Sequence, residues 1–337
     1  MSTDYKEKDI VISSRVRLAR NIKELPFAAM IQEVDSKKVI GLVEGALNNQ
    51  DQSMPSFNKV AVKDLNTNEK RILVEKHLTS KEWSKNDEAA VFIRKDECVS
   101  IMVNEEDHIR IQCILDSFQL RRAFEIANEI DDLLEEKIRY AFDDKYGYLT
   151  ACPTNVGTGM RASVMIHLPS LTLGNQMNDL IQTLARFGIT IRGIYGEGSQ
   201  SLGDLYQISN QITLGLNEET IIGNLHNVIK EIIKRERNVR NEMLSNNRIY
   251  LEDKVFRALG ILENARTITV EESMKLISLI RLGTDLEIIQ KDISEINRLM
   301  LSIQPGILSH TYGIPITNKL DNTRAEHIRK ILGKNNT

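Results

Sequence analysis

Short runs of alternating apolar and polar residues fill the first two thirds of the chain, and segments with helical spacing separate them. Alternation with a period of two is the pattern of a strand that is buried on one face. It predicts a sheet of at least five strands, which lie within residues 9–21, 100–112, 161–169, 189–198 and 205–215.

Two segments of this part have apolar residues at spacings of three and four, as an amphipathic helix requires. The first carries Leu120, Phe124, Ala127, Ile130, Leu134 and Ile138. The second is residues 178–188, which end at Gly188, and glycine commonly terminates a helix. We therefore expect helices to cover one face of the sheet, in an α+β fold whose sheet is antiparallel.

Beyond about Gly215, nearly every segment has helical spacing. An apolar stripe is formed by Ile221, Ile222, Leu225, Val228, Ile229 and Ile232. Thr269 and Glu272 have the spacing of a capping box at a helix start. Because a chain of 337 residues is long enough for two domains, we predict a mixed domain over residues 9–240 and an all-α domain over residues 241–337.

The composition narrows the class of partner. Lys and Arg total 44 against 47 Asp and Glu, which gives no electrostatic reason to expect nucleic acid or an anionic membrane. The three cysteines have no CxxC spacing, and no run of about 18 apolar residues is present. We expect a soluble, reduced protein of the cytoplasm.

Polar side chains recur on one face of several predicted strands. Alternation turns Ile12 toward the core. The residues expected on the open faces are Ser13, Arg15, Arg17, Glu106, His108, Arg110, Arg161, Ser163, Met165 and His167, and Arg192 closes a further strand. A single arginine on such a face is usually only solvated, but the repetition over four strands predicts a cleft for a strongly anionic ligand such as a triphosphate.

Common nucleotide-binding signatures do not account for this site. The chain has no GxxxxGK[ST] and no HRD or DFG set. Gly157, Gly159 and Ala162 satisfy GxGxxA, with Asp179 further on, but the residues that follow alternate like a strand. A dinucleotide site needs a helix N-terminus at that point, so we reject this interpretation.

Four longer segments carry a family resemblance. SSRVRLARN, VNEEDHIRIQ, CPTNVGTGMRASVMIHLP and RGIYGEGS resemble the successive signatures of the ATP:guanido phosphotransferases. QISNQITLG, VFRALGILENARTIT and LIRLGTDL resemble the bacterial protein-arginine kinases of that family. The resemblance implies a guanido kinase catalytic domain built on an antiparallel sheet, followed by a helical domain for dimerisation and substrate docking.

The resemblance also implies the residues of the site. The nucleotide would be bound by Ser13, Ser14, Arg15, Val16, Arg17, His77, Arg110, Arg161, Ala162, Ser163, Val164, Met165, Arg192, Gly193, Ile194, Tyr195, Gly196 and Glu197, with Mg²⁺ held through ATP. Glu197 and Glu106 would hold and deprotonate the guanidino group, and Cys152 matches the family's active-site cysteine. Asp321 and Arg324 match a phosphoarginine-docking element, but Leu320 stands where an arginine is expected.

Elementary chemistry supports the roles given to the two glutamate carboxylates. A guanidinium has a pKa above 12 and is nearly inert as a nucleophile until something orients it and accepts its proton. A glutamate can do both. His108 has two interpretations, a hydrogen-bonded structural residue or a catalytic one, whereas we expect Glu105 and Asp107 to be structural and Cys98 and Cys113 to be small buried residues.

The resemblance suggests partners as well. It implies protein substrates bound through arginine side chains, including a heat-shock repressor, together with a Clp ATPase and protease, an activator protein and a homodimer. Two alternatives stay open. A phosphagen kinase for free arginine is disfavoured because the helical N-terminal cover of those enzymes is missing here, and a catalytically silent adaptor is disfavoured by the retained glutamates and arginines.

Overall fold

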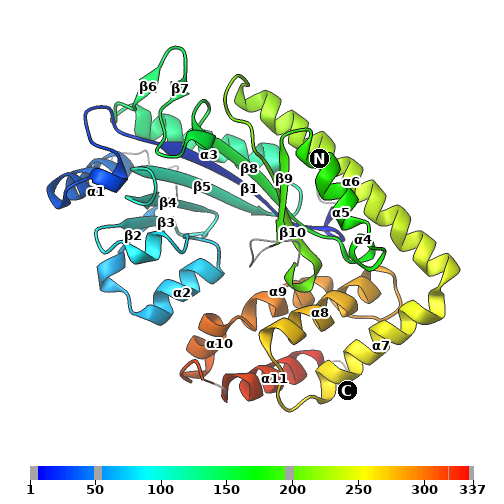
Figure 1. Cartoon of the computed structure of the whole chain (residues 1–337). Coiled ribbons are helices and arrows are strands. Elements are labelled where there is room, and N and C mark those ends of the chain that lie inside the picture. Colours follow the sequence, from blue (N-terminus) through cyan, green and yellow to red (C-terminus); the bar gives the residue numbers. More distant parts are fainter. Residues whose placement is uncertain (1–6, 49–54, 194–200, 318, 334–337) are drawn as a thin grey trace.

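A computed structural model describes residues 7–48, 55–193, 201–317 and 319–333. Its main feature is a sheet in the strand order β2-β3-β4-β5-β1-β8-β10-β9, in which every pairing is antiparallel (Figure 1). The strands are β1 (Val11–Arg20), β2 (Phe57–Ala61), β3 (Ala90–Arg94), β4 (Val99–Val103), β5 (Ile109–Asp116), β8 (Met160–His167), β9 (Ile189–Gly193) and β10 (Leu205–Asn210). A short hairpin pairs β6 (Phe142–Asp143) with β7 (Gly147–Tyr148). The predicted α+β class with an antiparallel sheet is confirmed.

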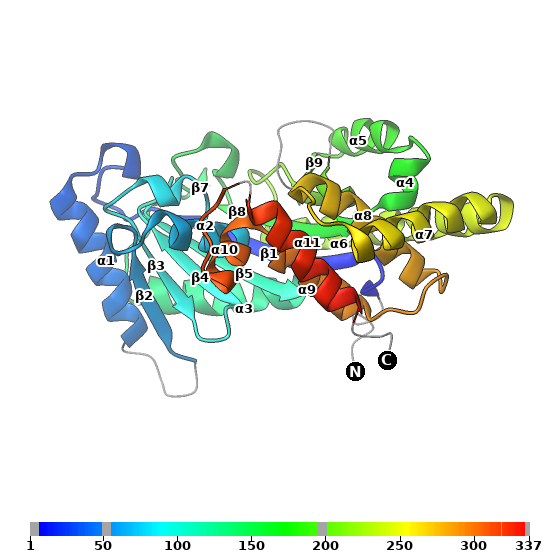
Figure 2. The same cartoon turned by 90° about the horizontal axis from the view of Figure 1, so that it is seen from below.

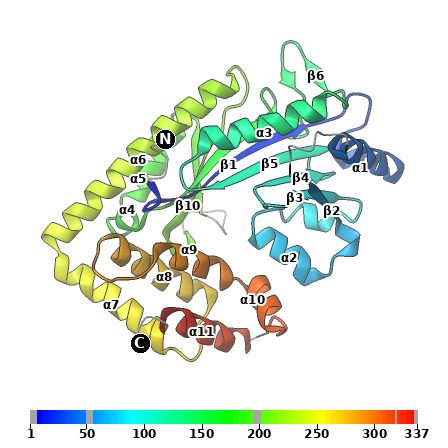
Figure 3. The ribbon, with the colours of Figure 1, turned by 180° about the vertical axis from the view of Figure 1, so that it is seen from behind.

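One face of the sheet is covered by helices, as predicted. They are α1 (Glu33–Asn48), α3 (Leu120–Glu135), α4 (Pro169–Leu173), α5 (Met177–Ala185) and α6 (Glu218–Asn246). Their apolar residues and the inward residues of the strands form the main core, and Figure 3 shows α3 and α6 lying along the sheet. The other face is left for the site, apart from α2 (Thr67–Glu75) and the small core beneath it around Trp83.

The C-terminal helices form a second core. They are α7 (Arg248–Asn264), α8 (Val270–Asp285), α9 (Ile293–Ser302), α10 (Pro305–Tyr312) and α11 (Lys319–Leu332). Thr269 caps α8 by accepting a hydrogen bond from the backbone N–H of Glu272. These helices lie on the open side of the sheet, in front of β1 when the molecule is viewed from below (Figure 2). None of the helices in the described part of the chain has the length and apolar character needed to cross a bilayer.

The segment 100–112, predicted as one strand, is two strands and a turn. β4 ends at Val103 and β5 begins at Ile109, and residues 104–108 connect them. Asn104 adopts the left-handed conformation (φ 60°), and its N–H donates to the carbonyl of His108. The polar run at 104–108 favours a turn over a strand, so the expectation that Glu106 and His108 share a strand face with Arg110 was wrong.

A second difference lies at the start of β1. The pairing register of β1 with β8 shifts between Val11 and Ser13, so one residue is unpaired there. Such a bulge re-aims a side chain. Ile12 therefore packs against the C-terminal helical core and not against the main core.

Candidate functional site

The strand register gathers the five arginines on one sheet face. Arg17 lies opposite Arg161, and Ala19, two residues on from Arg17, lies opposite Arg110. Arg15 lies opposite Ser163 and donates from Nε to its Oγ at 3.3 Å. Arg192 shares the face too, since it lies opposite Gln207, which in turn lies opposite Met165. Directly opposed residues of antiparallel strands point the same way, so all five side chains project from the open face.

Electrostatics within this cluster are unfavourable without a ligand. Burial and the charges of Arg161 and Arg110 lower the pKa of Arg15 to about 10. Burial and Arg15 hold the pKa of Arg17 well below its usual value, and burial and Arg192 lower that of Arg161. Each shift reports repulsion among desolvated like charges, which an anion would relieve.

Two hydrogen-bond donors in the cluster are unused. The Nε atoms of Arg17 and Arg161 are buried, and neither has a partner among the described residues. Buried donors nearly always have partners, so these two indicate where a ligand oxygen fits. Together with the excess positive charge, they match the phosphate groups of a polyphosphate ligand.

His77 lies at the edge of this cluster. Its φ is 59°, and its carbonyl accepts a hydrogen bond from Gln112 Nε2 at 2.8 Å. Burial and the charge of Arg15 lower the pKa of His77 to about 4, so the ring is neutral at pH 7. A small cavity beside it is lined by Ser13, Arg15, Ile114, Ser163, Met165 and Gln207.

Not every residue of the expected nucleotide set turns its side chain to this face. Val16, Ala162 and Val164 are buried in the main core. Ser14 is buried as well, donating to the carbonyl of Ser117 and accepting from the N–H of Gln119. Gly193 ends β9, whereas Ile194, Tyr195, Gly196 and Glu197 lie outside the described residues.

Two glutamates in the turn after β4 hold Arg110. Its Nη1 donates to Glu105 at 2.8 Å and its Nη2 to Glu106 at 2.9 Å. The Glu105 side chain is 2 % exposed and also accepts from Ser80, whereas that of Glu106 is 43 % exposed. Burial raises the pKa of Glu106 despite the neighbouring Arg110. Glu105 thus fixes the arginine, and Glu106 is the carboxylate that a second guanidinium can reach.

His108 and Asp107 are fully buried beneath this turn. His108 Nδ1 accepts from the N–H of Ile22 at 3.0 Å, so its proton is on Nε2, which donates to the carbonyl of Pro26 at 2.7 Å. Both ring nitrogens are occupied, which favours the structural interpretation of His108. Asp107 accepts from Asn21 and from the N–H of Ala151, each at 2.7 Å, and so anchors the segment before Cys152.

Cys152 is partly exposed close to the arginine cluster. Its Sγ lies 3.0 Å from Thr154 Oγ1, and Thr154 lines a hollow together with Arg161. A small hollow nearby is lined by Thr154, Asn155, Arg161, Thr190, Arg192, Asn210, Gln211 and Thr213. Of these lining residues, the sequence had indicated only the two arginines, because the others come from β9, β10 and two connecting segments, whose proximity is a tertiary property.

The thiols of the other two cysteines have raised pKa values. Cys113 is fully buried in the main core, and burial raises its pKa to about 12. Burial also raises the pKa of Cys98, which is partly exposed.

In the C-terminal region, Arg324 is 2 % exposed. It donates to the carbonyls of Ile303 and Ile268 and to the carboxylate of Asp321. Leu320 is buried as well, at 2 % exposure. Phosphoarginine docking at Asp321 and Arg324 stays a prediction.

The family profile of the ATP:guanido phosphotransferase C-terminal catalytic domain matches residues 38–239, and that of the protein-arginine kinase McsB C-terminal domain matches residues 248–337. A protein-arginine kinase of Caldanaerobacter subterraneus subsp. tengcongensis is 46% identical over 97% of this chain and 98% of its own length. One of Clostridium kluyveri is 48% identical over 97% of this chain and 95% of its own length.

Solved structures share the fold at lower identity. A lombricine kinase superposes with a TM-score of 0.61 at 23% identity, over 70% of this chain and 68% of its own. A duplicated taurocyamine kinase from Schistosoma mansoni, with bound transition-state analogue components, gives 0.66 at 19% identity, over 86% of this chain and 48% of its own.

Proposed function

Because the chain belongs to the ATP:guanido phosphotransferase family, in its protein-arginine kinase branch, we propose that it transfers the γ-phosphoryl group of ATP to arginine side chains of proteins. The observation that carries the proposal is the cluster of Arg15, Arg17 and Arg161, with two unused buried donors, beside the accessible carboxylate of Glu106. The arginine cluster can bind a polyphosphate, and the carboxylate can bind a cation.

In the proposed reaction, a guanidino nitrogen of the substrate attacks the γ-phosphorus. An N–P bond forms, the bond from the γ-phosphorus to the bridging oxygen breaks, ADP leaves, and the nitrogen loses a proton. Glu106 pairs with two N–H groups of the acceptor and fixes the attacking nitrogen in line. Glu197, assigned by resemblance, would share the clamp and the proton transfer.

The arginines act on the phosphates. Arg15, Arg17 and Arg161 are held by the sheet, so they need no reorganisation when charge develops on the transferred group. Mg²⁺ bound to the phosphates would supply further neutralisation of that charge. Cys152, whose neighbour Thr154 lines a hollow with Arg161, would contact the acceptor guanidinium.

Family membership supports further parts of the proposal. The modified proteins would be marked for degradation by a Clp protease under stress in the cytoplasm, and a heat-shock repressor would be among them. Residues 241–337 would serve dimerisation and substrate docking, with Asp321 and Arg324 in the docking element, and an activator protein would regulate the enzyme.

The test is a transfer assay. The purified protein would be incubated with Mg-ATP and either an unfolded arginine-rich protein or free arginine, and acid-labile N-linked phosphate would be measured. Glu106→Gln and Glu197→Gln serve as inactive controls. We expect transfer to the protein substrate alone. Labelling of free arginine would replace the proposal with a phosphagen kinase, and transfer to neither would favour the silent adaptor.

A further inference from the structure

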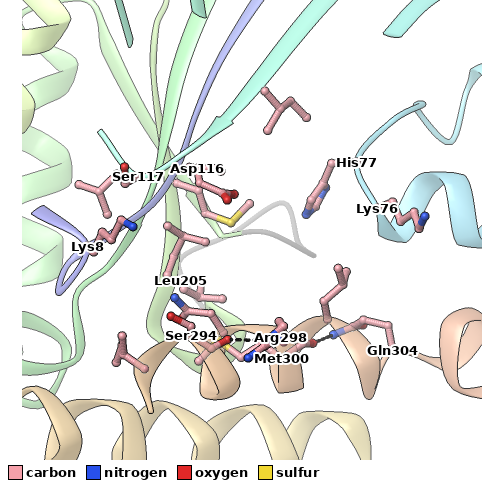
Figure 4. A pocket seen from close by; sticks show the side chains of 18 of the residues that line it. Lys8, Lys76, His77, Asp116, Ser117, Leu205, Ser294, Arg298, Met300 and Gln304 are labelled. Atoms are coloured by element: carbon pink, nitrogen blue, oxygen red, sulfur yellow. Dashed lines mark hydrogen bonds between the residues drawn. The ribbon is translucent and has the colours of Figure 1, made fainter. Parts of the chain in front are cut away.

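A second and larger cavity, of about 450 Å³, separates the sheet from the C-terminal helices. Its walls include Ile12, Ser13, Ile114 and Met165 from the strands and Arg298 and Leu301 from α9. Figure 4 shows Arg298 and Met300 on α9 facing His77 and Asp116 across it. The volume lies within the usual range for a small-molecule site, about 300–1,000 Å³.

This cavity continues into the arginine cluster. Ser13, His77, Ile114 and Met165 line both it and the smaller cavity that holds Arg15 and Ser163. The large cavity and the arginine cluster are therefore adjacent.

The order of groups along β1 fixes the direction of a bound nucleotide. Ser13 lies at the large cavity, and Arg15 and Arg17 follow along the strand. Ala19 comes next on the same face and lies opposite Arg110, which donates a hydrogen bond to Glu106. At about 3.3 Å per residue, Ser13 and Arg17 are about 13 Å apart. With the γ-phosphate directed toward Glu106, the base and ribose lie at the Ser13 end, in the large cavity.

We propose that α9 forms one wall of the adenosine subsite, with Leu301 against the base and Arg298 against the base edge or ribose. The proposal rests on ATP being the substrate, as inferred above. Leu301 is 41 % exposed although it is apolar, and Ile114 and Met165 line the cavity from the sheet side. Arg298 donates from Nε to the carbonyl of Ser294 in its own helix, which leaves its outer guanidinium nitrogens toward the cavity.

Two contacts hold the C-terminal helices against the catalytic part of the chain. Arg281 of α8 donates to Asn297, in the middle of α9, at 2.9 Å and to the carbonyl of Asp9, just before β1, at 2.7 Å. The Glu75 carboxylate, at the end of α2, accepts from the N–H groups of Gly306 and Ile307, each at 2.9 Å, at the start of α10.

The second of these contacts joins α10, the helix that follows α9, to the segment that carries the expected nucleotide-binding residue His77, since Glu75 precedes His77 by two residues. The C-terminal helices are therefore held next to the expected nucleotide site.

The test compares Arg298→Ala combined with Leu301→Ala against a matched control, Arg257→Ala combined with Ile261→Ala on α7. Arg257 is 75 % exposed at its side chain and Ile261 is 42 % exposed, and both lie in α7, away from the large cavity. Calorimetric titration with ATP, adenosine and inorganic tripolyphosphate would measure the two halves of the site separately, and a thermal melt would verify folding.

We expect the α9 variant to bind ATP and adenosine at least tenfold more weakly and tripolyphosphate within twofold of the parent, with the control unchanged. An unchanged affinity for ATP would overturn the inference, as would an equal loss for tripolyphosphate. The outcome is independent of the acceptor: a protein that shows the expected pattern but transfers nothing to arginine would retain this inference and lose the proposed function.

Discussion

Arg17 of β1 and Arg161 of β8 lie directly opposite one another, and the Nε atom of each is buried without a hydrogen-bond partner among the described residues. Two neighbouring guanidiniums in this state oppose folding, since each is desolvated and repelled by the other. Such an arrangement is expected where a bound anion offsets the repulsion between the two guanidiniums.

Replacing Arg17 with methionine should therefore raise the stability of the protein and weaken its binding of ATP. Without nucleotide, we expect the melting temperature of Arg17→Met to rise by about 2–4 °C, because a desolvated charge is removed while the apolar stem is kept. Affinity for ATP should fall at least tenfold. Thermal melts with and without Mg-ATP measure both effects, and Arg186→Met, at the exposed residue that follows α5, should change neither. A destabilised Arg17→Met protein would contradict this account of the cluster.

The neighbours Glu105 and Glu106 should have different kinetic roles. Glu106→Gln should lower turnover by about 10²-fold or more while ATP affinity stays within threefold, because the accessible carboxylate acts on the acceptor. Glu105→Gln should instead weaken ATP binding and stability, since Glu105 is buried and holds Arg110. Steady-state kinetics with ATP and with a protein substrate separate the two. Equal losses of turnover in both variants would refute the division of roles.

The three cysteines should react with iodoacetamide in a fixed order. At pH 7.5 we expect Cys152 to be alkylated at least tenfold faster than Cys98 or Cys113, because the raised pKa values of the latter two leave little thiolate. Peptide mass spectrometry over a time course gives the three rates. Faster modification of Cys98, which is also partly exposed, would be inconsistent with the structure.

His77 should make stability depend on pH. Its pKa is about 4 in the folded protein and about 6.5 in the unfolded chain, so the unfolded state binds more protons between these values. The contribution is therefore complete above pH 6.5 and is lost as the pH falls toward 4. Because the ring still touches solvent in the cavity, we expect a loss of about 1–2 kcal/mol, less than the full shift would give.

Urea unfolding of the parent and of His77→Asn, across pH 4 to 7, measures this contribution. Asparagine tolerates the positive φ at this position, so the backbone is preserved. The raised pKa values of Asp204 and Asp285 act in the opposite direction but are common to both proteins. A difference between the two curves that does not change with pH would exclude the assignment.

Much of the site was predictable because its signal is local. Alternation along β1 and β8 places Arg15, Arg17 and Arg161 on the open face without reference to any partner strand, since successive side chains of any strand point to opposite sides. The helical spacing at residues 120–138 and 178–188 likewise identified α3 and α5 as helices that cover the opposite face.

The hairpin at residues 104–108 could not be read in the same way. Val103 and Ile109 each continue an alternating pattern, so the choice between one strand and two depends on whether β4 can pair back onto β5. The left-handed conformation of Asn104 permits that pairing. As a result, Glu106 lies in a turn and not on a strand, and Glu105 is the buried residue that holds Arg110.

The sequence by itself determined the fold class, the shared face of Arg15, Arg17 and Arg161, and the chemical character of the site. Only the tertiary structure decided that Asp107 anchors Ala151 and that α9 closes a cavity over Ser13. The reason is physical: periodicity records how each segment packs against its own core. The packing of the C-terminal helices against the catalytic part depends instead on contacts between residues far apart in the chain, such as Glu75 of α2 with Gly306 of α10, which leave no periodic trace in either segment.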